Sequence, residues 1–262
     1  MSNVMERTLS ALALLAHHPD GLAVEQVAQA LNLAPSAAHR LLTDLVRLGY
    51  VRQIRDQGDY ALTLRLAALG LGYLGRAGIP DVVQPMLDAL AAQSGELVRL
   101  SVQDGARLVW VAVAQGATGG LRYDPAREQG ADVSLAYSAS GLAWLMTMPE
   151  DQAMQAVARQ GLKPPDGAAP GNALTLTDVA ALRAQALARG HAVAVGSYLA
   201  GMAALAVPVR GPDGAALGCL SIAGPAVRLT KARIAALAPV LRAAADQVGD
   251  AAAGSALFRG RG

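Results

Sequence analysis

The chain is poor in the residue types that stabilise small disulfide-rich or metal-bound folds. It has one cysteine, Cys219, in 262 residues, which excludes an internal disulfide and a zinc site built on cysteine pairs within one chain. Aromatic residues make up 3% of the sequence and charged residues 16%, so alanine, leucine and valine must fill the core. The low charge and the 53% hydrophobic content argue against a disordered or coiled-coil chain.

Long apolar runs and targeting segments are also missing. No stretch of about eighteen apolar residues without charges or turn breakers occurs, so we expect no membrane span. The first ten residues contain Glu6 and lack a basic region followed by an apolar core, so we expect no signal peptide. Together with the single cysteine, this favours a protein of the reducing cytoplasm. The formal net charge of +2 is too small to indicate nucleic-acid binding by itself.

Two short amphipathic helices joined by a tight turn are predicted between Val24 and Leu42, after an earlier helix over 5–16. From Val24, apolar residues recur at the i, i+3, i+4, i+7 spacing of one helix face. Asn32 tolerates the left-handed backbone of a turn, and Pro35 suits the first turn of the next helix. Gly49 closes that helix, whose expected buried face consists of Leu41, Leu42, Leu45 and Leu48.

The segment after these helices predicts a wing. Residues 50–55 and 59–62 are β-rich runs around a turn at 56–58. From Ser36 to Arg55, four arginines stand against one acid, Asp44, a local excess of +3 that suits phosphate contacts. The helix spacing alone also fits an ordinary helical hairpin, but the wing and the basic excess favour DNA binding. The residues expected at DNA are Arg7, Ser36, Ala37, His39, Arg40, Arg47, Arg52 and Arg55.

The rest of the chain predicts an α+β fold, an antiparallel sheet flanked by helices. A connecting helix is expected over 64–78 and another over 80–93. Strands are expected over 97–102, 108–114, 191–195, 203–209 and 216–222. Helices are expected over 142–148 and 150–159, from Thr177 or Asp178 to Arg189, and from Thr230 to about residue 252.

Two patterns that resemble enzyme motifs lack the context that those motifs need. A G-x-G-x-x-G run at 70–75 follows a predicted helix instead of a strand, which disfavours dinucleotide binding. His191 is the only histidine after His39, and no G-x-S-x-G occurs, which disfavours a catalytic triad. We therefore expect no enzyme activity, no cofactor and no metal. The alternatives are an enzyme or carrier whose N-terminal helices only mediate oligomerisation, and a ligand-binding module that acts through protein partners alone.

Several segments, in order and in register, resemble the IclR family of bacterial transcriptional regulators. They are Met-Glu-Arg at 5–7, His-Arg-Leu-Leu at 39–42, Leu-Gly-Tyr-Val at 48–51, and the runs over 60–70, 206–214 and 220–230. The resemblance covers about residues 5–248. It implies a winged helix-turn-helix domain over 1–63, a linker helix over 64–79, a GAF-like effector-binding domain over 80–252 and a flexible tail over 253–262.

The resemblance also implies function. Such a protein is expected to form a homodimer, often paired into a dimer of dimers, that binds a double-stranded DNA operator and responds to a small-molecule effector, here in control of a catabolic operon. The reader helix departs from the family pattern, because this chain has Pro-Ser-Ala-Ala at 35–38 where relatives often carry Lys-Ser-Thr-Val. We expect its specificity to depend on fewer polar contacts, chiefly those of Ser36, His39 and Arg40.

The resemblance places the effector pocket between the sheet and the segment around 134–146. Ala136 and Leu142 stand where relatives often have histidine and lysine, and Ala203 and Ala204 stand where they often have arginine and cysteine. Because each change removes polarity, we expect a small apolar or aromatic effector, neutral or weakly acidic. The candidate lining residues are Tyr123, Tyr137, Ser138, Ala139, Gly141, Trp144, Tyr198, Ala204, Cys219 and Ser221.

Overall fold

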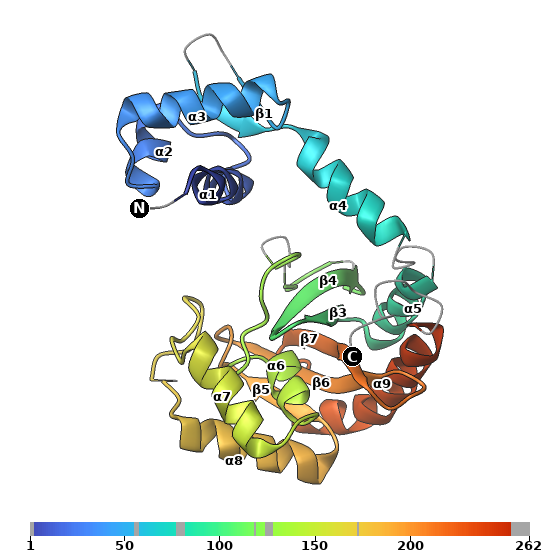
Figure 1. The fold of residues 1–262 in the computed structure, drawn as a ribbon. Coiled ribbons are helices and arrows are strands. Elements are labelled where there is room, and N and C mark those ends of the chain that lie inside the picture. Colours follow the sequence, from blue (N-terminus) through green and yellow to red (C-terminus); the bar gives the residue numbers. More distant parts are fainter. Residues whose placement is uncertain are drawn as a thin grey trace. The chain divides into compact units, whose positions relative to one another are not determined.

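The computed structural model describes residues 3–54, 58–76, 82–117, 119–123, 128–171 and 173–252. The chain divides into two compact units, Met1–Leu74 and Gly75–Gly262. The first unit contains α1 (Val4–Ala16), α2 (Val24–Ala30), α3 (Pro35–Arg47), β1 (Val51–Gln53), β2 (Tyr60–Leu62) and most of α4 (Leu64–Arg76) (Figure 1). The expected helix-turn-helix, hairpin and connecting helix are therefore all present. The expected tail over 253–262 lies outside the described residues.

The turn between α2 and α3 follows the sequence prediction closely. Asn32 has a φ of 51°, the left-handed conformation that lets the chain reverse within a few residues. Pro35 occupies the first turn of α3. The buried face of α3 is shorter than predicted, because Leu48 ends the helix as its C-cap and is 47% exposed. Leu42 and Leu45 are buried as predicted and join a core shared with α1, α2 and the hairpin, and Leu41 packs against that core partly buried.

The predicted wing is an antiparallel pair, in which Val51 lies opposite Leu62 and Gln53 opposite Tyr60. A third segment ties it to the helices: the Leu22 N–H donates to the Tyr60 carbonyl at 3.0 Å, and the Tyr60 N–H donates to the Leu22 carbonyl at 2.8 Å. The hairpin is thus held to the helical core at its base. Its tip, residues 55–57, lies outside the described residues.

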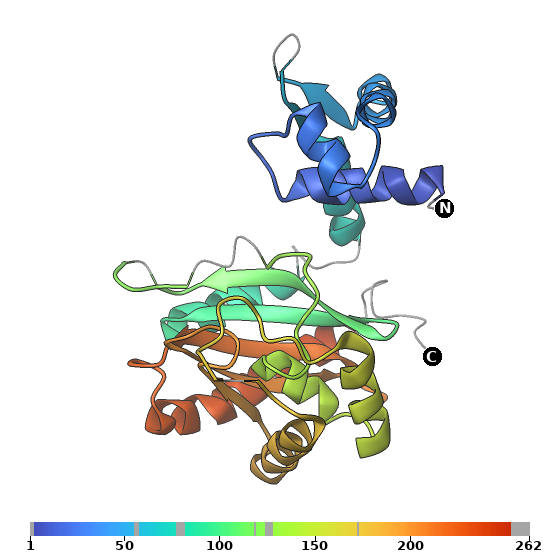
Figure 2. The ribbon, with the colours of Figure 1, turned by 90° about the vertical axis from the view of Figure 1, so that its left-hand side faces the viewer.

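The second unit is an antiparallel sheet between two layers of helices. Its strands are β3 (Leu97–Asp104), β4 (Arg107–Gln115), β5 (Ala192–Val195), β6 (Met202–Arg210) and β7 (Ala216–Pro225). Its helices are α5 (Gln84–Ser94), α6 (Ala139–Leu145), α7 (Glu150–Gln160), α8 (Leu176–Arg189) and α9 (Lys231–Ala252). Figure 2 shows α6, α7 and α8 in front of the sheet and α5 and α9 behind it.

The strand order is β4-β3-β7-β6-β5, so the last strand of the chain enters the middle of the sheet. β7 pairs with β3 on one side and with β6 on the other. This arrangement places residues from the early hairpin beside residues from the late one, for example Arg99 opposite Ser221 and Ser221 opposite Ala206. One face of the sheet therefore collects side chains that are more than a hundred residues apart.

The starts of α6 and α8 differ from the sequence prediction, and in both helices a capping residue explains the difference. α6 begins at Ala139 instead of residue 142, because the Ser138 side chain accepts the Gly141 N–H at 2.9 Å. α8 begins at Leu176 instead of Thr177 or Asp178. Its cap is Thr175, whose hydroxyl accepts the Asp178 N–H while the Asp178 carboxylate accepts the Thr175 N–H.

The 70–75 glycine run lies inside α4. A dinucleotide site needs a strand immediately before that pattern. Here β2 ends at Leu62 and α4 has already begun at Leu64, so the run has no such strand. The motif therefore carries no nucleotide-binding function in this fold.

A close backbone contact beneath α6 makes Gly141 intolerant of a side chain. A Cβ at this position would lie 2.3 Å from the Ser134 carbonyl oxygen and 2.5 Å from the Leu135 Cα. We predict that Gly141→Ala lowers the free energy of unfolding of the second unit by about 1–3 kcal/mol, because the overpacked backbone must shift. Urea unfolding followed by tryptophan fluorescence tests this, since Trp110 and Trp144 both lie in that unit.

The matched control is Gly70→Ala in α4, where nothing lies within 4 Å of the added Cβ. It should leave the tryptophan-detected midpoint unchanged. An equal midpoint for Gly141→Ala and the unmodified protein would contradict the prediction.

Candidate DNA-binding surface and effector pocket

The outer face of α3 carries the residues that the sequence marked as readers. The helix buries its apolar side in the N-terminal core, and the opposite side leaves Ser36, His39 and Arg40 exposed, with Ala37 half-buried. A helix with one buried face and one exposed polar face can be laid into a major groove without unfolding its core. The structure therefore brings these predicted residues together on one surface.

The start of α3 is electrostatically suited to a phosphate. The helix begins at Pro35 after Ala34, and no side chain caps its first turn, which also contains no acidic residue. The first N–H groups of a helix have no intrahelical acceptor and carry the positive end of the helix dipole. This end of α3 can thus accept an anionic oxygen from outside the protein.

Arg7 lies against α3. It lines a shallow hollow between α1 and α3 with Val4, Leu33, Ala37, Arg40, Leu41 and Asp44. Its Nε is buried and has no hydrogen-bond partner in the described part of the chain. Arg47 forms an exposed ion pair with Asp44 at 3.1 Å. Arg52 is exposed on β1, and Arg55 lies outside the described residues.

Arg65, at the start of α4, has a structural role that was not predicted from the sequence. Its Nη1 donates to the Leu48 carbonyl at 2.7 Å, and its guanidinium lies 5.1 Å from the centroid of the Tyr50 ring. The Thr63 hydroxyl donates to the Gly49 carbonyl at 2.6 Å. These contacts hold the end of α3 to the beginning of α4. No local pattern signals them, because residues 48–50 and 63–65 meet only in the folded hairpin.

The C-terminal unit contains a hollow on the sheet face that α6 covers. Its floor is a row of small side chains on neighbouring strands, in which Ala194 lies opposite Ala204 and Ala204 opposite Ala223. Small residues at adjacent positions leave space that larger ones would fill. The volume open to a water-sized molecule is about 30 Å³.

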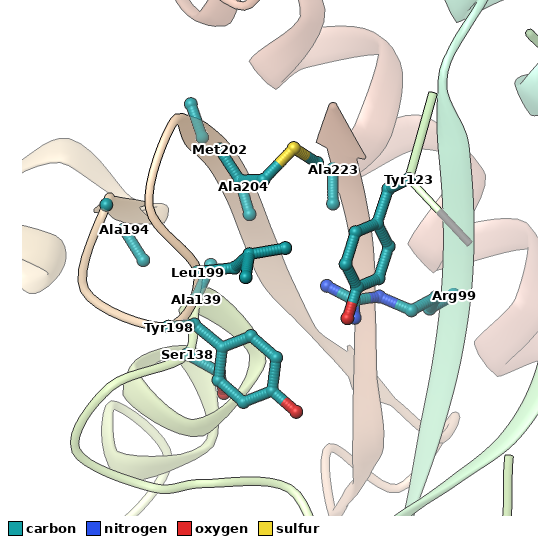
Figure 3. A pocket seen from close by; sticks show the side chains of 12 residues that line it. Arg99, Tyr123, Ser138, Ala139, Ala194, Tyr198, Leu199, Met202, Ala204 and Ala223 are labelled. Carbon is teal, nitrogen blue, oxygen red and sulfur yellow. The ribbon is translucent and has the colours of Figure 1, made fainter. Parts of the chain in front are cut away.

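The walls of this hollow come from several segments, as Figure 3 shows. α6 contributes its capping residue Ser138, β3 contributes Arg99, and the segment between β4 and α6 contributes Tyr123. The remaining lining residues come from the start of α6, the turn after β5 and the start of β6. They are Ala139, Gly196, Tyr198, Leu199, Met202 and Ala203. Backbone carbonyls hold Tyr123 in place: Leu121 accepts from Arg228 at 2.7 Å, and Tyr123 accepts from Gln115 at 2.8 Å.

A buried ion pair lies at the hollow. The Arg99 Nη1 donates to one oxygen of Glu128, and the Tyr123 hydroxyl donates to the other. Both charged side chains are 5% exposed. Burial raises the pKa of the Tyr123 and Tyr198 hydroxyls, and the nearby Glu128 carboxylate raises both further. Both hydroxyls are therefore protonated donors at neutral pH.

The structure brings half of the predicted effector residues to this hollow and places the others elsewhere. The residues at the hollow are Tyr123, Ser138, Ala139, Tyr198 and Ala204. Tyr137 does not line it but is buried in the core, where its hydroxyl donates to the Leu162 carbonyl at 2.8 Å. Gly141 packs on the 134–135 backbone, and Trp144 lines a separate groove with α7 residues. Cys219 and Ser221 lie buried in β7, where burial raises the pKa of the Cys219 thiol.

Arg99 and Glu128 are the site residues that sequence reasoning missed. Arg99 lies in the middle of a hydrophobic strand, where an arginine usually points to solvent. Its partner Glu128 is 29 residues away, so no helical or strand spacing connects the two. A charged residue inside the mostly apolar run 97–102 is the only local signal.

Within the described ranges, no group of three or more histidine, cysteine, aspartate or glutamate side chains is arranged to hold a metal ion. The same ranges contain no helix with the length and apolar character needed to cross a bilayer.

Comparison with known proteins covers both units. The helix-turn-helix domain of IclR regulators matches residues 4–55, and the C-terminal domain of the bacterial transcriptional regulator IclR matches residues 71–250. The acetate operon repressor of Salmonella typhimurium is 28% identical over 244 residues, which are 93% of this chain and 88% of that protein.

Solved structures share the fold. The IclR protein of Thermotoga maritima aligns with a TM-score of 0.71 at 23% identity, over 94% of this chain and 97% of its own. An IclR homologue from Microbacterium hydrocarbonoxydans, solved with 4-hydroxybenzoate, aligns with a TM-score of 0.74 at 20% identity, over 97% of this chain and 100% of its own. The expected N-terminal helix-turn-helix and C-terminal effector-domain architecture is confirmed, and the chain belongs to the IclR family of bacterial transcriptional regulators.

Proposed function

We propose that this protein is a ligand-responsive transcriptional regulator that controls a catabolic operon. It binds a double-stranded operator in the cytoplasm as a homodimer or a dimer of dimers, and it has no enzymatic step. The observation that carries the proposal is the exposed face of α3, which presents Ser36, His39 and Arg40 beside a helix start without acidic residues. In a dimer, two copies of α3 would enter successive major grooves roughly one helical turn apart.

The proposed DNA contacts divide into two kinds. Ser36, Ala37, His39 and Arg40 face the base edges, with Arg40 able to make a bidentate contact to guanine. Arg7, Arg47, Arg52 and Arg55 serve as cations near the backbone, where they position the domain without reading sequence. Since few side chains reach the bases, DNA shape also contributes to operator choice.

The proposed effector is a small aromatic compound bound in the hollow above Ala204. The apolar floor and the tyrosines of the wall support this, as does the family's IclR homologue that was solved with 4-hydroxybenzoate. The effector changes operator affinity only if it binds one state of the dimer better than the other. The domain boundaries at 63, 79 and 252 are part of the same proposal.

A mobility-shift assay with the DNA upstream of the protein's own gene tests the proposal. We expect a shifted band that persists with unrelated competitor DNA and changes with effector. A protein that binds this DNA no better than the competitor would be a carrier or an enzyme with N-terminal helices for oligomerisation.

Arg40→Ala tests the reader role. Loss of a bidentate guanine contact should weaken operator binding by about 1–3 kcal/mol, which is roughly 5- to 150-fold, and relax the preference at that base. Fluorescence anisotropy with operator and scrambled DNA measures both effects. Arg159→Ala is the control, because Arg159 is exposed on α7 in the effector unit. Unchanged affinity and base preference in Arg40→Ala would remove Arg40 from the reader set.

Ala204→Leu tests the hollow. The larger side chain fills the floor between Ala194 and Ala223, so we expect the affinity for an aromatic ligand to fall at least about tenfold, the effect of losing roughly 1.4 kcal/mol. Thermal shift with 4-hydroxybenzoate, phenol and glucarate measures ligand binding, and operator affinity without ligand should stay the same. Ala89→Leu on the exposed side of α5 is the control. A preference for the sugar diacid glucarate would contradict the aromatic assignment.

A further inference from the structure

The hollow in the effector unit is too small for an aromatic ring as it stands. A cavity of about 150 Å³ holds benzene, whereas this one offers about 30 Å³, room for a water molecule or two. Its floor belongs to strands β5, β6 and β7, and its walls come from β3, the start of α6, the turn at 196–199 and Tyr123. Tyr123 and Glu128 belong to the segment between β4 and α6 and reach the site only with their side chains. Displacement of these two side chains would enlarge the hollow.

Arg99 is incompletely paired by Glu128. One nitrogen, Nη1, meets one Glu128 oxygen, because the other oxygen accepts from Tyr123. The Arg99 Nε–H is buried with no acceptor in the described part of the chain. Elsewhere in the same unit, Arg228 and Glu96 form the two-nitrogen, two-oxygen pair that arginine favours, with distances of 2.6 and 2.7 Å. The Arg99 guanidinium therefore retains capacity for a better-placed carboxylate.

The surroundings hold this guanidinium in place for a ligand. Its central carbon lies 4.8 Å from the centroid of the Trp110 ring and 5.8 Å from that of Tyr123. Trp110 in turn meets Tyr198 edge-on, with centroids 5.7 Å apart. Two aromatic rings thus contact a cation whose charge is balanced, among the described residues, by Glu128 alone.

We propose that the effector carries a carboxylate, and that this carboxylate binds Arg99 in the place that Glu128 occupies in the unliganded protein. Glu128 acts as an internal stand-in for the ligand's acid group, and Arg99 determines specificity for it. Exchange of one carboxylate for another keeps the buried site neutral, whereas adding a second anion beside Glu128 would bury an unpaired charge at high cost. The Tyr123 and Tyr198 hydroxyls remain donors for either carboxylate. This inference rests on the effector-binding function proposed above.

Glu128→Gln separates the charge from the shape of this side chain. The probes are benzoate and its uncharged analogue benzamide, titrated calorimetrically into the full-length protein. Because the variant leaves Arg99 without a counter-charge, we expect benzoate to bind at least about tenfold tighter than to the unmodified protein. The affinity for benzamide should change by less than about twofold. The unliganded variant should also melt at a lower temperature, and benzoate should restore its stability.

Two further variants make the result decisive. Arg99→Gln combined with Glu128→Gln leaves no buried charge unpaired and should lose the preference for benzoate over benzamide. Asp132→Asn removes one negative charge from the same connecting segment but does not line the hollow, because Asp132 pairs with the exposed Arg107. This variant should not change the benzoate affinity.

Equal gains for benzoate and benzamide in Glu128→Gln, or no benzoate binding by any variant, would overturn the carboxylate assignment. A mobility shift without ligand on the same samples keeps this outcome separate from the regulatory function. Loss of operator binding would refute that function whatever benzoate does.

Discussion

The effector unit depends on the insertion of β7 between β3 and β6. β7 is the last strand in the sequence but lies at the centre of the sheet. Its Gly218 is so close to β3 that a Cβ at this position would lie 1.9 Å from the Ser101 carbonyl oxygen. Only this pairing places Arg99 beside Ser221 and extends the alanine row from β5 to Ala223. The hollow, the buried ion pair and the core that α6 covers all follow from one strand placement.

The same placement explains which parts could be predicted from sequence. The N-terminal unit was predictable because its signals are local: an apolar face repeats every three or four residues, Asn32 adopts the left-handed turn, and Pro35 starts α3. Strands and helices of the second unit were found within a few residues for the same reason. The cap at Thr175 was missed because two nearby residues also fit a helix start.

The candidate effector site was predicted less well, because the alignment of neighbouring strands brings its residues together. Ala204 was chosen by comparison with the family, but Ala194 and Ala223 become its neighbours only when β5, β6 and β7 align. From the sequence alone, Arg99 is a charged residue in a mostly apolar run, and its role is visible only once the fold places Glu128 beside it. Ser221 and Cys219 lie on the same face of β7 as the floor residue Ala223, but two and four residues along the strand from it. Pattern determines the face, and only pairing determines the position along it.

The contact of Arg65 with the end of α3 has a mechanical consequence for the regulator. Because Arg65 and Thr63 tie the Leu48–Tyr50 turn to the start of α4, the reader helix and α4 belong to one body, which ends at Leu74. Thirteen helical residues make α4 a lever about 20 Å long. If α4 rotates by about 10° about its C-terminal end, its N-terminal end moves by about 3.5 Å, which is close to the spacing of successive base pairs. In the regulator proposed above, an angular change this small would put α3 one base pair out of register with the operator.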